Sequence, residues 1–285
     1  MTGGLLQFAR AIEFLLAVGG LVFAGVGLRL FFLQSRLVFR PSRETVGSLG
    51  DYRLAFEEVT LDLRGAGRIS GCVKGWWIPG SLPGKVILYF PGAIGNMSCE
   101  VGTLAWLAKT GAHVMAVDYP GFGLSPGRPS ERGCYRAAEA AWRYAVDEKR
   151  IQPADVTIFG RSLGAGIAAR LASQRDCGSL VIHSGVASVP AVAARRYPLL
   201  PTYFFCYIRF NALKYLRRCH CPTLVMHSPT DRVIPLSHGK RIFSAASSPK
   251  RFISLPGDHY SNEWQAVPGL ADEVGAWLFS GLVTR

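Results

Sequence analysis

Acidic side chains are scarce in this chain, which carries 19 Asp and Glu against 32 Lys and Arg and has a formal net charge of +13. The basic residues are scattered singly or in doublets and surround no nucleic-acid-binding motif, so we expect no nucleic-acid partner. Regular cysteine spacing is also missing. The seven cysteines are an odd number, which disfavours a disulfide framework and agrees with a reducing compartment. Cys219 and Cys221 have no second pair to complete a zinc motif, and the sequence contains no internal repeat or low-complexity segment.

Charge is absent from Phe14 to Leu28, and with one snorkelling arginine the apolar run extends to Leu33. These roughly 20 residues are enough to cross a bilayer as a helix. A cleaved signal peptide is the alternative, but the run is long, Glu13 borders it, and no A-x-A cleavage site follows. We therefore expect an uncleaved membrane anchor in residues 1–35, followed by one larger domain in residues 36–285.

Basic residues flank this apolar segment unevenly. Arg10 is the only one before it, whereas Arg29, Arg36, Arg40 and Arg43 follow it. Because segments rich in Lys and Arg stay on the cytoplasmic side, the sequence predicts a single-pass membrane protein with its large domain in the cytoplasm. The net positive charge makes the anionic surface of that membrane an expected partner.

Short continuous apolar runs, typical of strands buried on both faces, alternate with helical segments through the rest of the chain. Two earlier strands are expected at Phe56 to Leu63 and Ile69 to Ile78, joined by a Gly65-Ala66-Gly67 turn. The expected buried strands are Val86 to Phe90, Val114 to Val117, Val156 to Phe159, Leu180 to Ile182, Thr223 to Met226 and Phe252 to Leu255. The main expected helices are Cys99 to Lys109, Glu131 to Glu148, Gly239 to Ala246 and Gly269 to Leu278. This alternation predicts an α/β fold with a mostly parallel sheet and helices on both faces, in which chemistry gathers at the carboxyl ends of the strands.

The sequence Gly160-Arg161-Ser162-Leu163-Gly164 lies between the strand expected to end at Phe159 and an alanine-rich helix expected to run to Ala172. A sharp strand-to-helix turn strains the backbone of its middle residue, and glycine at both flanks relieves the crowding. The turn exposes the Ser162 hydroxyl at a helix N-terminus, where free backbone N–H groups can stabilise an oxyanion. We therefore predict that Ser162 is a nucleophile.

A second G-x-S-x-G match, Gly123-Leu124-Ser125-Pro126-Gly127, lacks this context. No strand leads directly into it, and Pro126 has no N–H to offer to an oxyanion. Pro126 and Pro129 also prevent a helix from following. We expect this segment to be a loop in which Ser125 is not the nucleophile.

A serine hydroxyl is a poor nucleophile unless a histidine takes its proton and a carboxylate orients that histidine. The loops after the last two expected strands supply Asp231 and His259. The predicted triad is therefore Ser162, Asp231 and His259, which occur in the chain order that α/β-hydrolases use.

Other histidines and carboxylates compete for these roles. His183 and His227 also lie at strand ends, but neither follows a candidate acid in the required order, so we expect them to support the site through hydrogen bonds. Asp258 adjoins His259, yet in an ordinary loop it is expected to point elsewhere.

From about Phe56 onward the chain resembles the α/β-hydrolase superfamily of serine hydrolases, in particular small membrane-anchored members related to protein depalmitoylases and lysophospholipase-like esterases. The shared motifs, as they stand here, are Phe90-Pro-Gly-Ala-Ile-Gly-Asn96, Asp118-Tyr-Pro-Gly-Phe-Gly-Leu-Ser125, Gly160-Arg-Ser-Leu-Gly164, Asp231-Arg-Val-Ile-Pro235 and Gly257-Asp-His259. The resemblance implies an α/β-hydrolase fold with an oxyanion hole made of the backbone N–H groups of Leu163 and Ala93. Many relatives have histidine where this chain has Pro91.

Residues from about 184 to 221 correspond to the cap, the most variable region of such folds. This segment has no acidic residue and six basic ones: Arg195, Arg196, Arg209, Lys214, Arg217 and Arg218. It also contains the apolar and aromatic run from Leu199 to Ile208. Two interpretations stay open: a lid that faces the membrane and admits acyl chains, or aromatic side chains that pack onto the sheet.

Together these features predict a membrane-anchored serine hydrolase that cleaves carboxylic esters or thioesters of lipid or acyl substrates through an acyl-enzyme, with no metal or cofactor implied. One alternative is a serine peptidase of the same fold, although related peptidases usually add a large gating domain. Another is a catalytically silent membrane scaffold. The anchor is expected to contribute nothing to the catalytic crevice, so that removing residues 1–33 would leave a domain that is active on short soluble esters.

Overall fold

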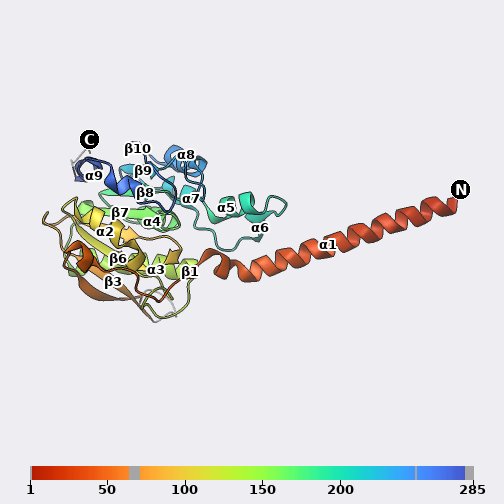
Figure 1. The fold of residues 1–285 in the computed structure, drawn as a ribbon, viewed down its shortest axis with the longest axis horizontal. Helices are drawn as coiled ribbons and strands as arrows, with labels where there is room; N and C mark the ends of the chain where they lie inside the picture. The colour runs from red at the N-terminus through yellow and green to blue at the C-terminus, as the bar shows by residue number, and fades with distance from the viewer. Residues whose placement is uncertain (1, 64–70, 248, 280–285) are drawn as a thin grey trace.

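The computed structural model of the chain describes residues 2–63, 71–247 and 249–279. Its centre is an eight-stranded sheet with the strand order β10-β9-β8-β7-β4-β6-β3-β2 (Figure 1). Neighbouring strands from β10 to β6 in this order pair in parallel, and β3 and β2 complete the sheet in antiparallel fashion. The strands are β2 Glu57–Asp62, β3 Cys72–Ile78, β4 Val86–Phe90, β6 His113–Val117, β7 Val156–Arg161, β8 Ser179–His183, β9 Thr223–His227 and β10 Lys250–Ser254. The predicted α/β fold with a mostly parallel sheet is confirmed.

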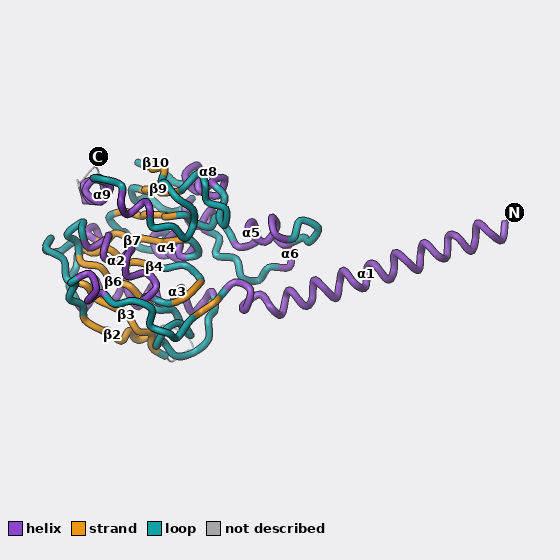
Figure 2. The backbone as a smooth tube through the Cα atoms, in the orientation of Figure 1, coloured by secondary structure: helices purple, strands orange, loops and turns teal. Residues whose placement is uncertain are grey.

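Helices cover both faces of this sheet (Figure 2). Along β4 the buried side chains alternate between two core clusters, with Leu88 in one and Ile87 in the other, because successive strand residues point to opposite faces. Helices α3, α4 and α8 contribute to the Leu88 cluster, whereas α2 and α9 contribute to the Ile87 cluster. The helices are α2 Val101–Ala108, α3 Glu131–Arg143, α4 Gly164–Ala172, α7 Ala212–Leu216, α8 Leu236–Ala245 and α9 Leu270–Phe279.

Two expected elements differ from the observed ones. The helix expected to reach Glu148 ends at Arg143, and a single π-helical turn, Tyr144–Glu148, follows it. The expected strand from Ile69 begins outside the described residues and is seen from Cys72, and the Gly65-Ala66-Gly67 turn also lies outside them.

Helix α1 (Thr2–Val38) extends away from the domain as one long helix (Figure 1). Its segment Arg10–Val38 has a mean hydropathy of 2.1 and is long and apolar enough to cross a membrane, a property that membrane spans share with signal sequences. Large apolar side chains are exposed along it, including Phe14 and Leu21. Exposed apolar surface of this extent is unfavourable in water.

The basic stretch from Arg36 to Arg43 connects α1 to the domain through regular structure. Helix α1 runs through Val38, and Arg40–Pro41 form the short strand β1, which pairs in parallel with β5 (Ile94–Gly95) in the loop region after β4. Phe39, the residue between α1 and β1, is buried, and its ring packs edge-on against Phe122 and Phe210. Backbone pairing and a buried aromatic side chain therefore attach α1 directly to the domain.

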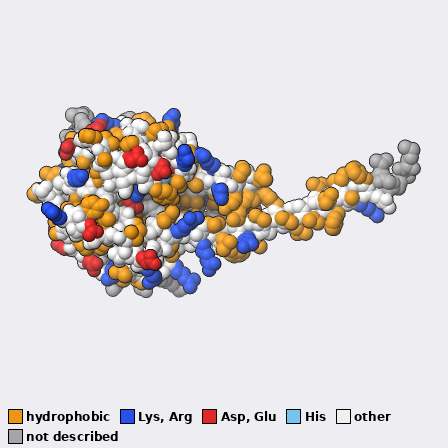
Figure 3. All heavy atoms as spheres, in the orientation of Figure 1, with side chains coloured by type: hydrophobic (Ala, Val, Ile, Leu, Met, Phe, Trp, Pro, Cys, Tyr) orange, Lys and Arg blue, Asp and Glu red, His pale blue; other side chains and the backbone are white. Residues whose placement is uncertain are grey.

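The cap lies beside the domain end of α1 (Figure 1) and contains α5 (Val189–Arg196) and α6 (Thr202–Phe205). Its apolar run divides between two environments. Leu199 and Phe204 are 87% and 80% exposed, whereas Ile208 is buried in the core. Hydrophobic side chains continue from α1 onto the domain, and Lys and Arg side chains surround this junction (Figure 3).

Candidate active site

Ser162 occupies a strained turn between β7 and α4. Its φ angle is +53°, in the left-handed region that non-glycine residues rarely adopt. A Cβ atom added at Gly160 would lie 2.4 Å from the Gly164 carbonyl oxygen, and one added at Gly164 would lie 2.0 Å from the Phe90 carbonyl oxygen. Only glycine fits at either flank, which is the steric reason for the G-x-S-x-G sequence.

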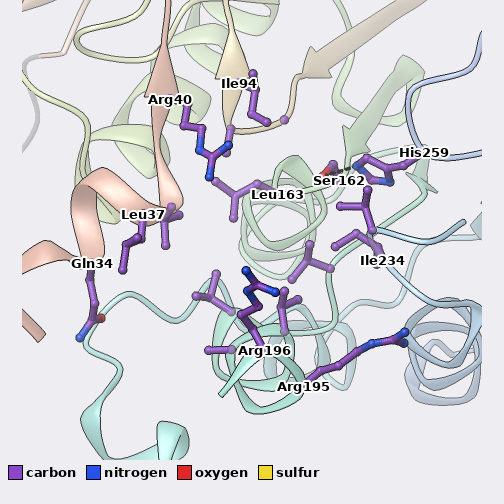
Figure 4. A pocket seen from close by; sticks show the side chains of 18 of the residues that line it. Gln34, Leu37, Arg40, Ile94, Ser162, Leu163, Arg195, Arg196, Ile234 and His259 are labelled. Carbon is purple, nitrogen blue, oxygen red and sulfur yellow. Dashed lines mark hydrogen bonds between the residues drawn. The ribbon is translucent and has the colours of Figure 1, made fainter. Parts of the chain in front are cut away.

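The three predicted triad side chains form one hydrogen-bonded chain. His259 Nε2 lies 3.0 Å from Ser162 Oγ (Figure 4), and His259 Nδ1 lies 2.7 Å from Asp231 Oδ2. The loops after β7, β9 and β10 supply these residues at one edge of the sheet, where the carboxyl ends of parallel strands meet. In this arrangement His259 can accept the Ser162 proton at Nε2 while Asp231 orients the ring.

Asp231 is held as a charged acceptor. The backbone N–H groups of Val233 and Ile234 donate to its Oδ1 over 2.9 and 2.7 Å. Burial by itself would raise the pKa of Asp231, but the hydrogen bond and charge of His259, together with the Ile234 N–H, outweigh burial and lower that pKa. An ionised Asp231 keeps the proton of His259 on Nδ1 and leaves Nε2 free to act as a base.

The competing groups have other partners. His227 Nε2 donates to the Ile234 carbonyl over 2.8 Å, and burial lowers the pKa of His227. His183 packs against the Trp264 ring with centroids 4.6 Å apart, and burial lowers its pKa well below the usual value. Asp258 Oδ1 accepts from the N–H groups of the two residues that follow His259. His227 supports the Asp231 loop, whereas Asp258 stabilises its own turn.

The two predicted oxyanion donors lie beside Ser162. Leu163 and Ala93 line the same cavity as the serine, and neither N–H donates to a backbone carbonyl in the described turns and loops. The loop that carries Ala93 is fixed on both sides, because the Ala93 carbonyl accepts from the Arg40 N–H and the Pro91 carbonyl accepts from the Tyr119 hydroxyl. Pro91, which stands where many relatives have histidine, is thus held through its carbonyl oxygen.

Ser125, the serine of the second G-x-S-x-G match, is fully buried and takes no part in the hydrogen bonds among Ser162, His259 and Asp231. Its hydroxyl donates to the Asp118 carbonyl over 2.9 Å and accepts from the Lys74 N–H over 2.8 Å. The Ser125 hydroxyl therefore joins its loop to β3, both as a donor and as an acceptor of a hydrogen bond. This geometry matches the expectation that the segment is a loop.

One part of the site was not found from the sequence. Arg161, the residue before Ser162, forms an ion pair with Glu100 over 2.6 Å, and Tyr89 donates to the same carboxylate over 2.8 Å. Arg161 Nη2 also donates to the His259 carbonyl over 3.2 Å. The pair therefore connects the turn of Ser162 to the loop of His259. Glu100 lies 61 residues before Arg161, so no local pattern indicates the pairing.

A cavity of about 850 Å³ opens at Ser162 and His259. Its walls come from the loop that carries Ala93, from the cap and from the last turns of α1, which contribute Gly27, Leu30, Phe31, Gln34, Leu37 and Val38. The expectation that the anchor contributes nothing to the crevice is therefore wrong. Sequence periodicity could not reveal this contact because it depends on how α1 meets the cap.

Comparisons with known proteins agree with this architecture. A family model described as alpha/beta hydrolase fold matches residues 85–205. The uncharacterized protein Rv2307c of Mycobacterium tuberculosis is 32% identical over 254 residues, which cover 88% of this chain and 89% of that protein. The alpha/beta hydrolase domain-containing protein aho-3 of Caenorhabditis elegans is 33% identical over 145 residues, covering 51% of this chain and 42% of that protein.

Solved structures show the same fold. The esterase Pf2001 of Pyrococcus furiosus matches with a TM-score of 0.68 at 19% sequence identity, covering 84% of this chain and 98% of that one. An alpha-beta hydrolase of Vibrio vulnificus matches with a TM-score of 0.61 at 22% identity, covering 76% and 80%. The chain belongs to the α/β-hydrolase family.

Proposed function

We propose that this protein is a membrane-anchored serine hydrolase that cleaves esters or thioesters of acyl substrates. The observation that carries the proposal is the hydrogen-bonded chain from Ser162 through His259 to Asp231 at the mouth of an apolar cavity. Esterases among the structural neighbours support the reaction class through their shared fold.

The proposed reaction has two acyl-transfer steps. Ser162 Oγ attacks the acyl carbon as its proton passes to His259 Nε2, and the N–H groups of Leu163 and Ala93 stabilise the resulting oxyanion. The carbon–oxygen or carbon–sulfur bond then breaks, and the leaving alcohol or thiol takes the proton from His259. Water, deprotonated by His259, hydrolyses the acyl-enzyme and restores the Ser162 hydroxyl.

Membrane attachment through α1 is the second part of the proposal. Its support is the apolar segment Arg10–Val38, together with the exposed cap residues Leu199 and Phe204 near its end. Basic side chains around that junction (Figure 3) favour an anionic membrane surface, at about 1 kcal/mol for each cation close to it. We place the catalytic domain on the cytoplasmic side because the basic flank of α1 lies at its domain end.

Kinetics of paired serine variants test the reaction. Ser162→Ala should lower kcat on an acyl ester by roughly 10⁴-fold or more, since removing a nucleophile leaves only binding and oxyanion stabilisation. Ser125→Ala is the matched control and should retain most activity, although the loss of two buried hydrogen bonds should lower its stability. Full activity of Ser162→Ala would overturn the nucleophile assignment. A wild-type protein inactive on esters, thioesters and peptides would instead favour a silent scaffold.

A further inference from the structure

One face of α1 forms a wall of the cavity. The described α1 residues that line it recur every three or four positions, which is the spacing of a single helical face: Gly27, Leu30, Phe31, Gln34, Leu37 and Val38. At 1.5 Å per residue, this wall is about 17 Å long from Gly27 to Val38. Gln34 alone among these residues carries a polar side chain. An amide on an apolar wall is unfavourable unless it forms hydrogen bonds.

The partners of Gln34 lie in the cap. Gln34 is 8% exposed, and its Nε2 donates to the Phe205 carbonyl over 2.9 Å. Its Oε1 accepts from the Tyr207 N–H over 2.9 Å and from the Ile208 N–H over 3.3 Å. The ring of Phe31, one turn earlier on α1, packs against the Tyr207 ring with centroids 5.2 Å apart. We call these hydrogen bonds and this ring packing the α1–cap contact.

The cap segment that Gln34 holds depends on side chains for its backbone hydrogen bonds. Helix α6 ends at Phe205, and residues 206–210 form neither helix nor strand. Beyond the groups that bond to Gln34, the Glu131 carboxylate of α3 accepts from the N–H groups of Arg209 and Phe210 over 2.7 and 2.9 Å. Side chains from two helices thus replace the secondary-structure partners that this segment lacks. Gln34 supplies the attachment to α1.

The α1–cap contact lies away from the proposed chemistry. Figure 4 shows Gln34 on the opposite side of the cavity from Ser162 and His259, with its side chain directed toward the cap. Phe205, whose carbonyl accepts from Gln34, and the adjacent Cys206 also line the cavity. Loss of the contact would therefore change the width of the cavity at its distant end and leave the geometry at Ser162 intact.

We infer that Gln34 is a specificity-determining residue, because it holds the cap against α1 and thereby sets the acyl-chain length that the cavity prefers. This inference rests on the proposed function and goes beyond it by assigning the chain-length preference to one residue of α1. The acyl carbon lies at Ser162, and the chain extends along α1 toward Gln34. The distant carbons of a long chain contact both walls, whereas a short chain ends before it reaches them. Gln34 acts through the cap and is a positioning residue.

The test measures kcat/KM of the full-length protein in nonionic detergent on the butanoate, octanoate and dodecanoate esters of one alcohol. Wild-type kcat/KM should rise with chain length, by up to roughly fourfold for each methylene group that the cavity buries. Gln34→Met keeps the side-chain length and an apolar wall but removes the three hydrogen bonds. It should lower kcat/KM on the dodecanoate by roughly tenfold, mainly by raising KM, and leave the butanoate nearly unchanged.

Ser35→Ala is the matched control. Ser35 follows Gln34 on α1, its hydroxyl donates to the Pro129 carbonyl over 3.5 Å, and it is not among the described residues that line the cavity. This variant should keep the wild-type chain-length profile. Phe31→Leu is a second test of the α1–cap contact, since it keeps an apolar wall and loses the ring packing on Tyr207. It should lower kcat/KM on the dodecanoate severalfold and spare the butanoate, which keeps the inference testable if Gln34→Met does not fold.

Several outcomes would overturn the inference without affecting the proposed hydrolase. These are a wild type whose kcat/KM does not rise with chain length, an equal loss on all three esters in Gln34→Met, and equal effects of Gln34→Met and Ser35→Ala. A Phe31→Leu protein with the wild-type profile would also overturn it. Fluorophosphonate labelling of Ser162 in each variant verifies that the site near the serine is still assembled. A wild type that neither hydrolyses any of these esters nor reacts with the fluorophosphonate would contradict the proposed function itself.

Discussion

At the residue scale, the ion pair between Arg161 and Glu100 lies close to the proposed chemistry. Both side chains are nearly enclosed, at 12% and 10% exposure, and Arg161 also holds the His259 carbonyl. Removing one member of a buried pair leaves an uncompensated charge, which costs about 3 to 5 kcal/mol. The pair is thus a positioning element, because it joins the loops of Ser162 and His259 without touching the reacting atoms.

Arg161→Gln should therefore lower the free energy of unfolding by about 3 kcal/mol, measured by denaturant titration. It should also lower kcat more than it raises KM, because the His259 loop loses one attachment. Adding Glu100→Gln should recover much of the stability by removing the unpaired charge, but not the kcat, since the contact to His259 is still missing. Recovery of both quantities together would show that the pair stabilises the fold without positioning His259.

The raised pKa of Asp118 should make the stability of the folded protein depend on pH. Its Oδ1 accepts from the Met97 N–H over 2.8 Å, yet burial raises its pKa from 3.8 to about 6. The folded state then binds the Asp118 proton more tightly than the unfolded chain does. The stability that this proton contributes is present below pH 4 and is lost as the pH rises through 6.

Asp118→Asn should remove this pH dependence, because the amide retains the acceptor oxygen without a charge. At pH 7 the variant should be more stable than the wild type by about 2 kcal/mol, and the difference should shrink toward pH 4. Denaturant titrations of both proteins at several pH values measure this difference in the free energy of unfolding. A difference that does not vary with pH would mean that Asp118 ionises freely in the folded protein.

The sequence was sufficient to predict which residues come together at the candidate site, but not what supports them. Ser162, Asp231 and His259 each follow a strand of the parallel part of the sheet, so strand order brought them to one edge of the sheet. Arg161 and Glu100 are distant in the chain and meet only through the packing of tertiary structure.

At the element scale, the sequence predicted helix α1 itself but not the contacts that α1 makes. Hydropathy predicted a long apolar helix, which the structure contains. It could not predict that the helix continues into β1, or that Gln34 bonds to the cap, because those contacts depend on tertiary partners. Residues of α1 line the cavity, so the prediction that a protein without residues 1–33 remains active applies to short soluble esters and does not extend to long-chain substrates.

Two deletions separate membrane attachment from the cavity wall. Deleting residues 2–24 keeps Gly27, Leu30 and Phe31, whereas deleting residues 2–33 removes these parts of the wall. The longer deletion should lower kcat/KM on a long-chain ester by roughly tenfold or more relative to the shorter one, since each lost apolar contact costs about 1 kcal/mol or more. Both proteins should hydrolyse a short soluble ester at similar rates. Equal kcat/KM values on the long-chain ester would show that α1 only anchors the protein.

At the scale of the whole molecule, the fold was predictable because the core strands are continuous apolar runs separated by helices. The runs ending at Phe90 and Phe159 became adjacent central strands, β4 and β7, as expected for strands buried on both faces. The arrangement of the cap was not predictable. Leu199 and Phe204 are exposed while Ile208 is buried, and hydrophobicity alone does not distinguish these environments.

The orientation of the whole molecule in the membrane can be tested by protease protection. Sealed vesicles that carry the full-length protein with its cytoplasmic side outward should leave the large domain open to added protease. The fragment that stays with the membrane should contain α1, whose apolar segment ends at Val38. Protection of the large domain in intact vesicles, with digestion only after they are opened, would place it on the opposite side.

The central claim is that Ser162 is an activated nucleophile. A fluorophosphonate forms a covalent bond with such a serine, so the full-length protein should carry the label on the peptide that contains Ser162, as located by mass spectrometry. Ser125→Ala should be labelled like the wild type, and Ser162→Ala should not be labelled. A folded wild-type protein that stays unlabelled, or that carries the label on another serine, would contradict the account.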